Sequence, residues 1–404
     1  MKILVFAYAC EPGQGSEPAV GWMWSQMLTG LGEVWVITRA NNREAIEAAA
    51  APDGVHFVYV DLPAWARFWK RGRRGLNLYY LLWQIAAFRR ARKLMKETSF
   101  DLAWHLTIAN VWMGSVAPLT NLPAVFGPVG GGVSPPWRLA NVLGVRGLAH
   151  EVARSIVRSL ARYLNLLARL TWRRSDLILV QNGETKRWLP AAHRKKTAVL
   201  PNPMVEWASR EDAGGERWER TALYAGELIP LKGVALAIQT IVHLPQWKLI
   251  ICGRGRDDAR LRRLAEKLGV LDRIEFRGWV PHEELMSLMG CASVLLFPSL
   301  HDEGGFVVVE ALHMGLPVVC LDRGGPPELG GTPVQASSPG ATARALADAV
   351  EDAAGTTPPA PPDQRLKKRQ LARLLQESGL ISPETARSFA SEGPGGRVTD
   401  ERPG

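Results

Sequence analysis

Two short apolar runs, residues 294–297 and 318–321, constrain the fold of this chain more than any other feature. Both are uncharged and rich in Val and Leu, which is typical of strands buried in a parallel sheet. Parallel strands need a crossover, and residues 298–317 leave room for one helix. Gly304 and Gly305 precede the expected helix, Gly315 follows it where a left-handed cap belongs, and Pro317 would stop it just before the second strand. The pattern predicts a helix that begins near Gly305, at the carboxyl end of a strand.

The start of this predicted helix carries residues suited to a phosphorylated sugar. Gly304 and Gly305 have no Cβ and would leave backbone N–H groups open to an anion. Asp302 precedes them, and Glu310 follows in the second helical turn. Sugar hydroxyls are donors that bind charged acceptors firmly, so a phosphate site between two carboxylates suggests a sugar diphosphate. Open α/β sheets place their ligands at this end of their strands.

The same residues resemble a family signature. Asp302, seven intervening residues, Glu310 and then A-L-x-x-G-x-P-V-V are similar to the motif of retaining glycosyltransferases of family 4. The resemblance implies that Asp302 contacts the donor sugar and that Glu310 contacts the ribose of the nucleotide. Glu303 is an alternative to Asp302 in a shifted register. The resemblance also implies an α/β protein of GT-B fold, with two Rossmann-like doubly wound domains facing a central cleft, over about residues 1–350.

Alternating strands and helices divide the chain into four predicted parts. Residues 1–200 would be an N-terminal Rossmann-like acceptor domain, and residues 201–218, with Pro and Gly breaks, an interdomain linker. Residues 219–352 would be a C-terminal nucleotide-sugar domain. Residues 353–404 read as a Pro/Gly-rich and basic tail, partly disordered, with a basic amphipathic helix and little resemblance to the family.

We expect the positive charge that neutralises the donor diphosphate to come from the first turn of the second domain. The resemblance implies that Lys232 neutralises the diphosphate, but Glu227 stands where the family has an arginine. Unless Glu227 points away, Lys232, Arg254 or the helix start must carry the charge. Gly253 suits close approach by the nucleotide, with a bare turn as the simpler alternative, and the loop at Val280 resembles the base-binding backbone. The sequence has no D-x-D pattern, so we expect no metal ion and no cofactor besides the donor.

His105 is the candidate catalytic residue of the first half. It ends a predicted strand in the sequence Asp-Leu-Ala-Trp-His. A lone histidine is more often structural, but the D-L-x-x-H pattern resembles the place where the family keeps an active-site histidine near the transferred sugar.

Two glycine-rich loops of the first half are expected to line the same cleft. Gly15 lies after the first strand, where the resemblance implies contact with the donor diphosphate or the acceptor, and Ser16 and Glu17 would start the next helix on the acceptor side. Gly130 and Gly131 follow a second strand and are placed on the acceptor side as well. Plain turns without a ligand remain the alternative for both loops.

Basic and apolar residues dominate two further segments. Residues 65–96 carry many Lys, Arg and aromatic residues and no acid. Nucleic acid, anionic lipid and a solvated helix face are all compatible with that composition, and without a nucleic-acid-binding motif we favour peripheral membrane contact. Residues 148–172 predict one amphipathic helix with a second basic surface. Its periodic residues are Val152, Ile156, Leu160, Leu164, Leu167 and Thr171, and its arginines are Arg154, Arg158, Arg162 and Arg169.

Composition supports a two-domain intracellular protein. A chain of 404 residues suits two domains, and its net charge of +10 requires an acidic partner or surface. Four scattered cysteines indicate a reducing compartment. The first apolar run is too short for a signal peptide and the longest later one too short for a membrane span. We therefore expect a cytoplasmic protein, with a peripheral position at the inner face of the membrane as an extension of that expectation.

The predicted function is transfer of a hexose, with retention, from a nucleotide-diphosphate sugar to a glycan or lipid-linked acceptor in cell-envelope or exopolysaccharide synthesis. Nucleic acid is not an expected partner. A nucleotide-sugar epimerase of similar fold remains an alternative. A non-catalytic sugar-nucleotide-binding protein is the other alternative, and Glu227 favours it.

Overall fold

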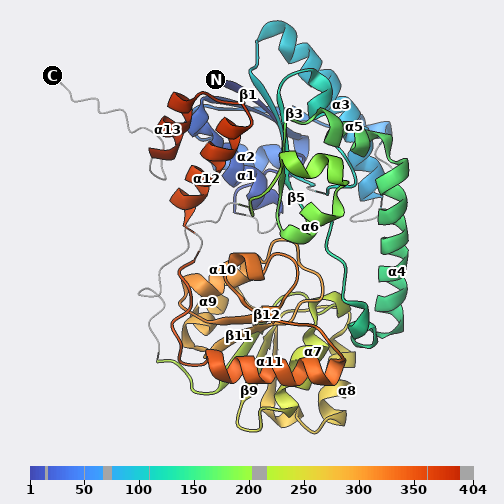
Figure 1. The fold of residues 1–404 in the computed structure, drawn as a ribbon, viewed down its shortest axis with the longest axis vertical. Helices are drawn as coiled ribbons and strands as arrows, with labels where there is room; N and C mark the ends of the chain where they lie inside the picture. The colour runs from blue at the N-terminus through green and yellow to red at the C-terminus, as the bar shows by residue number, and fades with distance from the viewer. Residues whose placement is uncertain are drawn as a thin grey trace, which may run out of the picture. The chain divides into compact units, whose positions relative to one another are not determined.

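The computed structural model describes residues 1–13, 17–49, 51–66, 75–108, 110–202, 216–361 and 363–391. The chain forms two compact units, which Figure 1 colours along the sequence. Unit 1 comprises residues 1–131, 160–203 and 364–404, and unit 2 comprises residues 132–159 and 204–363.

Unit 1 contains a parallel sheet with the strand order β3-β2-β1-β4-β5-β6-β7. Its strands are β1 (Lys2–Phe6), β2 (Glu33–Arg39), β3 (Val55–Val60), β4 (Leu102–His105), β5 (Ala124–Val129), β6 (Leu177–Val180) and β7 (Thr197–Val199). Its helices include α1 (Glu17–Leu28), α2 (Arg43–Ala48), α3 (Leu76–Glu97), α5 (Leu166–Arg174) and α6 (Gly183–Trp188). The strand order reverses between β1 and β4, which makes their carboxyl ends the ligand-binding position of such a sheet.

Unit 2 repeats this plan with the order β10-β9-β8-β11-β12-β13, again parallel. Its strands are β8 (Thr221–Ala225), β9 (Lys248–Cys252), β10 (Ile274–Gly278), β11 (Val294–Phe297), β12 (Val318–Leu321) and β13 (Thr332–Val334). Its helices are α7 (Val234–Val242), α8 (Asp258–Lys267), α9 (His282–Cys291), α10 (Phe306–His313) and α11 (Pro339–Ala353). Helix α4 (Ala140–Leu164) begins in unit 2, and its last residues are counted with unit 1. The order reverses between β8 and β11.

The predicted first domain, residues 1–200, is interrupted in the structure. Residues 132–159 group with unit 2, because Leu139, Val142 and Leu143 are buried in the core around the sheet of unit 2. The division at about residue 200 was inferred from a Pro-rich break, which gives no information on long-range packing. Most of the predicted linker, residues 203–215, lies outside the described residues.

The described part of the predicted tail packs with the first unit. Helices α12 (Gln364–Glu377) and α13 (Pro383–Ser391) belong to unit 1 and bury Leu371, Leu375 and Phe389. Lys367 donates from Nζ to the carbonyl oxygen of Asn202 at 2.8 Å, and burial lowers its pKa to about 8. The predicted basic amphipathic helix is therefore present, and it packs with the first unit. Residues 392–404 lie outside the described part.

The amphipathic helix predicted at residues 148–172 is two helices, α4 and α5, separated at Asn165. The Asn165 side chain accepts from the N–H of Ala168 and caps α5. The burial of α4 is the reverse of the usual arrangement, because Val152, Ile156, Leu160 and Leu164 are exposed while Glu151 and Arg158 are buried. The apolar periodicity of this segment is real, but it marks the outer face of α4.

The aromatic residues predicted for the membrane-facing segment are largely in the core of unit 1. Tyr79, Tyr80 and Trp83 on α3 are at most 2% exposed, whereas Trp65 is 78% exposed. The residues of this segment at positions 67–74, which include Arg67, Phe68, Trp69, Lys70, Arg71, Arg73 and Arg74, lie outside the described residues. No helix in the described part of the chain is long and apolar enough to cross a membrane.

Candidate functional site

Lys232 and Asp302 form the centre of the candidate site in unit 2. Lys232 ends a 3-10 turn (Pro230–Lys232) that follows β8, and Asp302 lies in the loop that follows β11. Because β8 and β11 are parallel neighbours at the reversal of strand order, these loops emerge at the same edge of the sheet. Lys232 Nζ lies 2.6 Å from Asp302 Oδ2. The sequence predicted both residues, and the topology brings them together.

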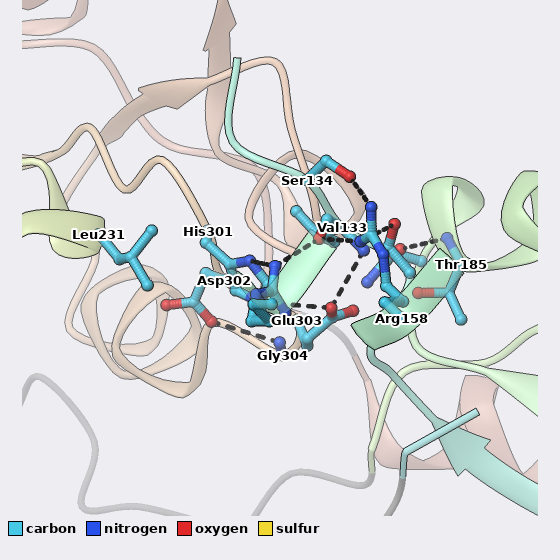
Figure 2. A network of polar contacts seen from close by, with 12 residues as sticks. Val133, Ser134, Arg158, Thr185, Leu231, His301, Asp302, Glu303 and Gly304 are labelled. Carbon is cyan, nitrogen blue, oxygen red and sulfur yellow. Dashed lines mark hydrogen bonds and ion pairs between the residues drawn. The ribbon is translucent and has the colours of Figure 1, made fainter. Parts of the chain in front are cut away.

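The Asp302 carboxylate also occupies the predicted phosphate-binding amides. Its Oδ1 accepts from the N–H of Gly305 at 2.8 Å and from that of Gly304 at 3.3 Å, and Figure 2 shows Asp302 turned towards Gly304. Gly305 has φ +67°, a left-handed conformation that glycine adopts readily. In this structure Asp302 holds the place of an anion at the start of α10.

Glu310 lies on α10, three residues before its last residue. Burial raises the pKa of its carboxyl group from 4.5 to about 7. An ionised carboxylate here is therefore costly unless hydroxyl or N–H donors reach it. The group is suited to a ligand that brings donors, as a ribose would.

Glu303 and His301 connect this loop to residues 132–159, the first part of unit 2 in the sequence. Glu303 Oε1 accepts from the N–H of Val133 at 3.1 Å, and Figure 2 shows these residues close together. Arg154 donates from Nη2 to His301 Nδ1 at 2.5 Å, so a neutral His301 carries its proton on Nε2, which lies 3.5 Å from Glu303 Oε1. Burial, followed by the charge of Arg154, holds the pKa of His301 well below its usual range.

Two arginines of α4 complete this network. Arg154 pairs from Nε with Glu151 at 3.1 Å, and the Glu151 side chain has no exposed area. Arg158 donates to the carbonyl oxygens of Gly132 and Val133 at 3.1 and 2.7 Å and to the Ser134 hydroxyl. From the sequence, both arginines are expected on the basic surface of an amphipathic helix. No local pattern signals their role, because every partner except Glu151 lies more than twenty residues away in sequence.

The remaining predicted donor residues of unit 2 lie in neighbouring turns. Glu227 is exposed and lies two residues after the end of β8. Gly253 needs its lack of a side chain, since a Cβ there would lie 1.8 Å from the carbonyl oxygen of Gly226. Val280 is half-buried between β10 and α9. The packing of Gly253 fits the simpler interpretation of a tight turn.

His105 ends β4 at the reversal point of the unit 1 sheet. It is 3% exposed, its Nε2 lies 3.5 Å from the Tyr80 hydroxyl, and its ring is tilted against Phe126. Burial lowers its pKa to about 3, so the ring is neutral at ordinary pH. Its buried Nδ1 has no hydrogen-bond partner among the described residues. A neutral imidazole of this kind can accept or donate a hydrogen bond, but it carries no charge.

The predicted acceptor-side residues of unit 1 are partly described. Glu17, the first residue of α1, accepts from the N–H of Ile108 at 3.0 Å, just beyond β4. Gly130 pairs with Asn110 in an isolated bridge, and Gly131 has φ +93° with no space for a Cβ next to the Asn110 side chain. Gly15 and Ser16 lie outside the described residues.

No group of three or more His, Cys, Asp or Glu side chains placed to hold a metal ion occurs within the described ranges. The cations close to His301 are Arg154, Lys232, Arg158 and Arg323.

Two doubly wound parallel units, the second with a lysine and a glycine-rich helix start at its reversal point, define the GT-B class of fold. The cleft predicted between the units stays a prediction.

The sequence comparison identifies the second part of the chain. Residues 206–368 match the family described as "Glycosyl transferases group 1". The predicted resemblance is thereby confirmed for those residues at the level of glycosyltransferases group 1, and family 4 stays a prediction. The matched residues make up less than half of the chain and include Lys232, Asp302 and Glu310.

Curated relatives and solved structures agree with this assignment. O-antigen chain mannosyltransferase B of Escherichia coli is 32% identical over 164 residues, which are 39% of this chain and 43% of that protein. The phosphatidylinositol N-acetylglucosaminyltransferase gpi3 subunit of Schizosaccharomyces pombe is 31% identical over 140 residues, 33% of this chain and 31% of that protein. The matches span less than half the length of these relatives. The structure of HepE from Anabaena in complex with UDP has a TM-score of 0.55 at 17% identity, over 93% of this chain and 100% of that one, a likeness in fold.

Proposed function

We propose that this chain is a retaining glycosyltransferase of family 4 that transfers a hexose from a nucleotide-diphosphate sugar to a glycan or lipid-linked acceptor. The observation that carries the proposal is the Lys232–Asp302 pair at the glycine-rich start of α10. It combines a cation, two backbone N–H groups and a carboxylate that are suited to a diphosphate and a sugar hydroxyl. It also lies within the residues that match the glycosyltransferase family.

In the proposed reaction the donor displaces Asp302 from the helix start. The diphosphate then takes the N–H groups of Gly304 and Gly305 and the charge of Lys232, so the leaving group is stabilised without a metal ion. Asp302, freed from these groups, accepts a hydrogen bond from a hydroxyl of the hexose. Glu310 accepts hydrogen bonds from the hydroxyls of the ribose. The C1–O bond to the diphosphate breaks as the acceptor oxygen bonds to C1 on the same face, and the acceptor proton passes to the leaving phosphate oxygen.

The names of the relatives support the substrate class. One is a mannosyltransferase of O-antigen chains and another an N-acetylglucosaminyltransferase acting with phosphatidylinositol, and HepE was solved with UDP. We propose a role in cell-envelope or exopolysaccharide synthesis, at the inner face of the membrane when the acceptor is lipid-linked. We propose that His105 of unit 1 acts near the transferred sugar, where its neutral ring serves as a hydrogen-bonding group, and that Glu17 lies on the acceptor side.

A panel of UDP-, GDP- and ADP-sugars tests the proposal. One donor should raise the melting temperature of the native chain and be hydrolysed slowly, and Glu310→Ala should lose both effects. The anomeric configuration of the first product, followed by NMR, should match that of the donor. Donor turnover that yields an epimerised nucleotide sugar would favour the epimerase. Binding without any turnover would favour a non-catalytic binding protein, the alternative suggested by Glu227.

A further inference from the structure

Helix α4 presents its apolar side to solvent. Val152, Ile156, Leu160, Tyr163 and Leu164 are between 42% and 70% exposed. At 100° per residue these side chains fall on one side of the helix. The opposite side carries Arg154 and Arg158, which are held by carbonyl groups of residues 132–133 and by Glu151. A helix whose polar side faces the protein and whose apolar side faces water lacks a partner for that apolar side.

The apolar side continues beyond the end of α4 within unit 1. Leu166 and Leu170 on α5 are 69% and 40% exposed. We call the exposed apolar residues of unit 1 at the end of α4 and on α5, which are Leu160, Tyr163, Leu164, Leu166 and Leu170, the outer apolar face.

The charges beside this face have one sign. No Asp or Glu occurs between Val152 and Ser175. Besides Arg154 and Arg158, which face the protein, this stretch holds Arg162, Arg169, Arg173 and Arg174, and the last three are exposed on α5. Arginine next to exposed Leu, Ile and Tyr is the composition of helices that lie in the headgroup layer of a bilayer.

We propose that the outer apolar face is the surface by which this protein binds an anionic lipid bilayer. The apolar side chains enter the boundary between headgroups and acyl chains, and the flanking arginines remain at the phosphates. A second copy of the chain is the weaker candidate, because a two-fold interface would bring the same arginines together. This proposal rests on the proposed function, which includes a membrane partner, and it adds the surface that contacts the membrane. The outer apolar face is not the aromatic surface predicted at residues 65–96, where Tyr79, Tyr80 and Trp83 are buried.

The test compares two variants of the full chain that keep its charge. Leu160→Gln with Leu164→Gln removes two side chains that are 53% and 70% exposed, so the fold should persist. The matched control is Val242→Gln with Leu271→Gln, each 41% exposed on unit 2. Cosedimentation is measured with vesicles of phosphatidylcholine, with and without phosphatidylglycerol, at low and high salt.

The native chain and the control should bind phosphatidylglycerol vesicles and be released by salt, and the Leu160/Leu164 variant should bind at least about tenfold more weakly. Absence of vesicle binding by the native chain, or equal binding by both variants, would overturn the proposal. A native dimer without lipid that the Leu160/Leu164 substitutions dissociate would show instead that a second copy covers the face. A thermal shift with a donor sugar, unchanged in the Leu160/Leu164 variant, separates loss of membrane binding from failure of the proposed donor site.

Discussion

Asp302 and Lys232, seventy positions apart in the sequence, form a 2.6 Å ion pair at the reversal point of the unit 2 sheet. The same carboxylate accepts hydrogen bonds from the N–H groups of Gly304 and Gly305. The lysine and the two helix-start amides predicted to bind a donor diphosphate are thus already engaged with Asp302. A diphosphate that enters this site must compete with that carboxylate for the same lysine and the same amides.

Substitution Asp302→Asn should therefore separate binding from chemistry. Without the competing charge, the affinity for the correct nucleoside diphosphate should rise several-fold, since a neutral amide holds Lys232 and the N–H groups less strongly than a carboxylate. Transfer should fall at the same time, because the acceptor for the sugar hydroxyl is weakened. Calorimetric titration and a transfer assay measure the two effects, and a parallel loss of both would contradict the competition.

Glu310 should make stability depend on pH. Its folded-state pKa of about 7 lies above that of an unfolded glutamate, so its contribution is complete below about pH 4.5 and is lost as pH rises through 7. The shift corresponds to at most about 3.5 kcal/mol of unfolding free energy. Urea unfolding of Glu310→Gln should show a larger gain over the native chain at about pH 8 than at about pH 5. A gain independent of pH would show that Glu310 is charged at low cost.

Arg154 should be essential for the stability of unit 2. Substitution Arg154→Met leaves the Glu151 carboxylate buried without its cation, and breaking a buried pair of this kind costs about 3 kcal/mol or more. Adding Glu151→Gln should restore much of the loss, since the uncompensated charge is then removed. Urea unfolding of the single and double variants measures both changes. If the double variant were as unstable as the single one, the hydrogen bonds to Val133 and His301 would dominate instead.

His105 should remain neutral over the working pH range. With its pKa lowered to about 3 by burial, its imidazole signals should not shift in NMR spectra between about pH 5 and 8. We expect His105→Gln to reduce transfer through the lost hydrogen bond while the pH profile keeps its shape. A titration of His105 near its usual pKa, or a changed profile in the variant, would contradict a neutral role.

Local sequence patterns predicted the elements of this fold well and their partners less well. The strands at residues 294–297 and 318–321 have their predicted bounds, because buried parallel strands are short apolar runs. Strands β7 and β13 were missed, since each has three residues and lies at a sheet edge. Gly315 adopts the predicted left-handed conformation after α10, with φ +65°.

Long-range contacts account for what the sequence did not reveal. The spacing of Ile156 and Leu160 defines one side of α4 but not whether that side faces the protein. Backbone carbonyls of residues 132–133 attract Arg158 inwards, and those carbonyls are distant in sequence. Asp302 was predicted as a sugar ligand, and its contacts with Lys232 and Gly305 depend on how the sheet brings two loops together.

Calorimetric titration of UDP, GDP and ADP into the native chain and into Lys232→Ala tests the central claim most directly. The exposed Lys267→Ala serves as the matched control, since it removes an equal charge from α8. We expect one nucleotide to bind the native chain and the control alike, and Lys232→Ala to bind it at least about tenfold more weakly, as expected for a lost charge-assisted contact to phosphate. Equal affinity in native chain and Lys232→Ala, or no binding of any of the three nucleotides, would contradict the assignment of this loop as the donor diphosphate site.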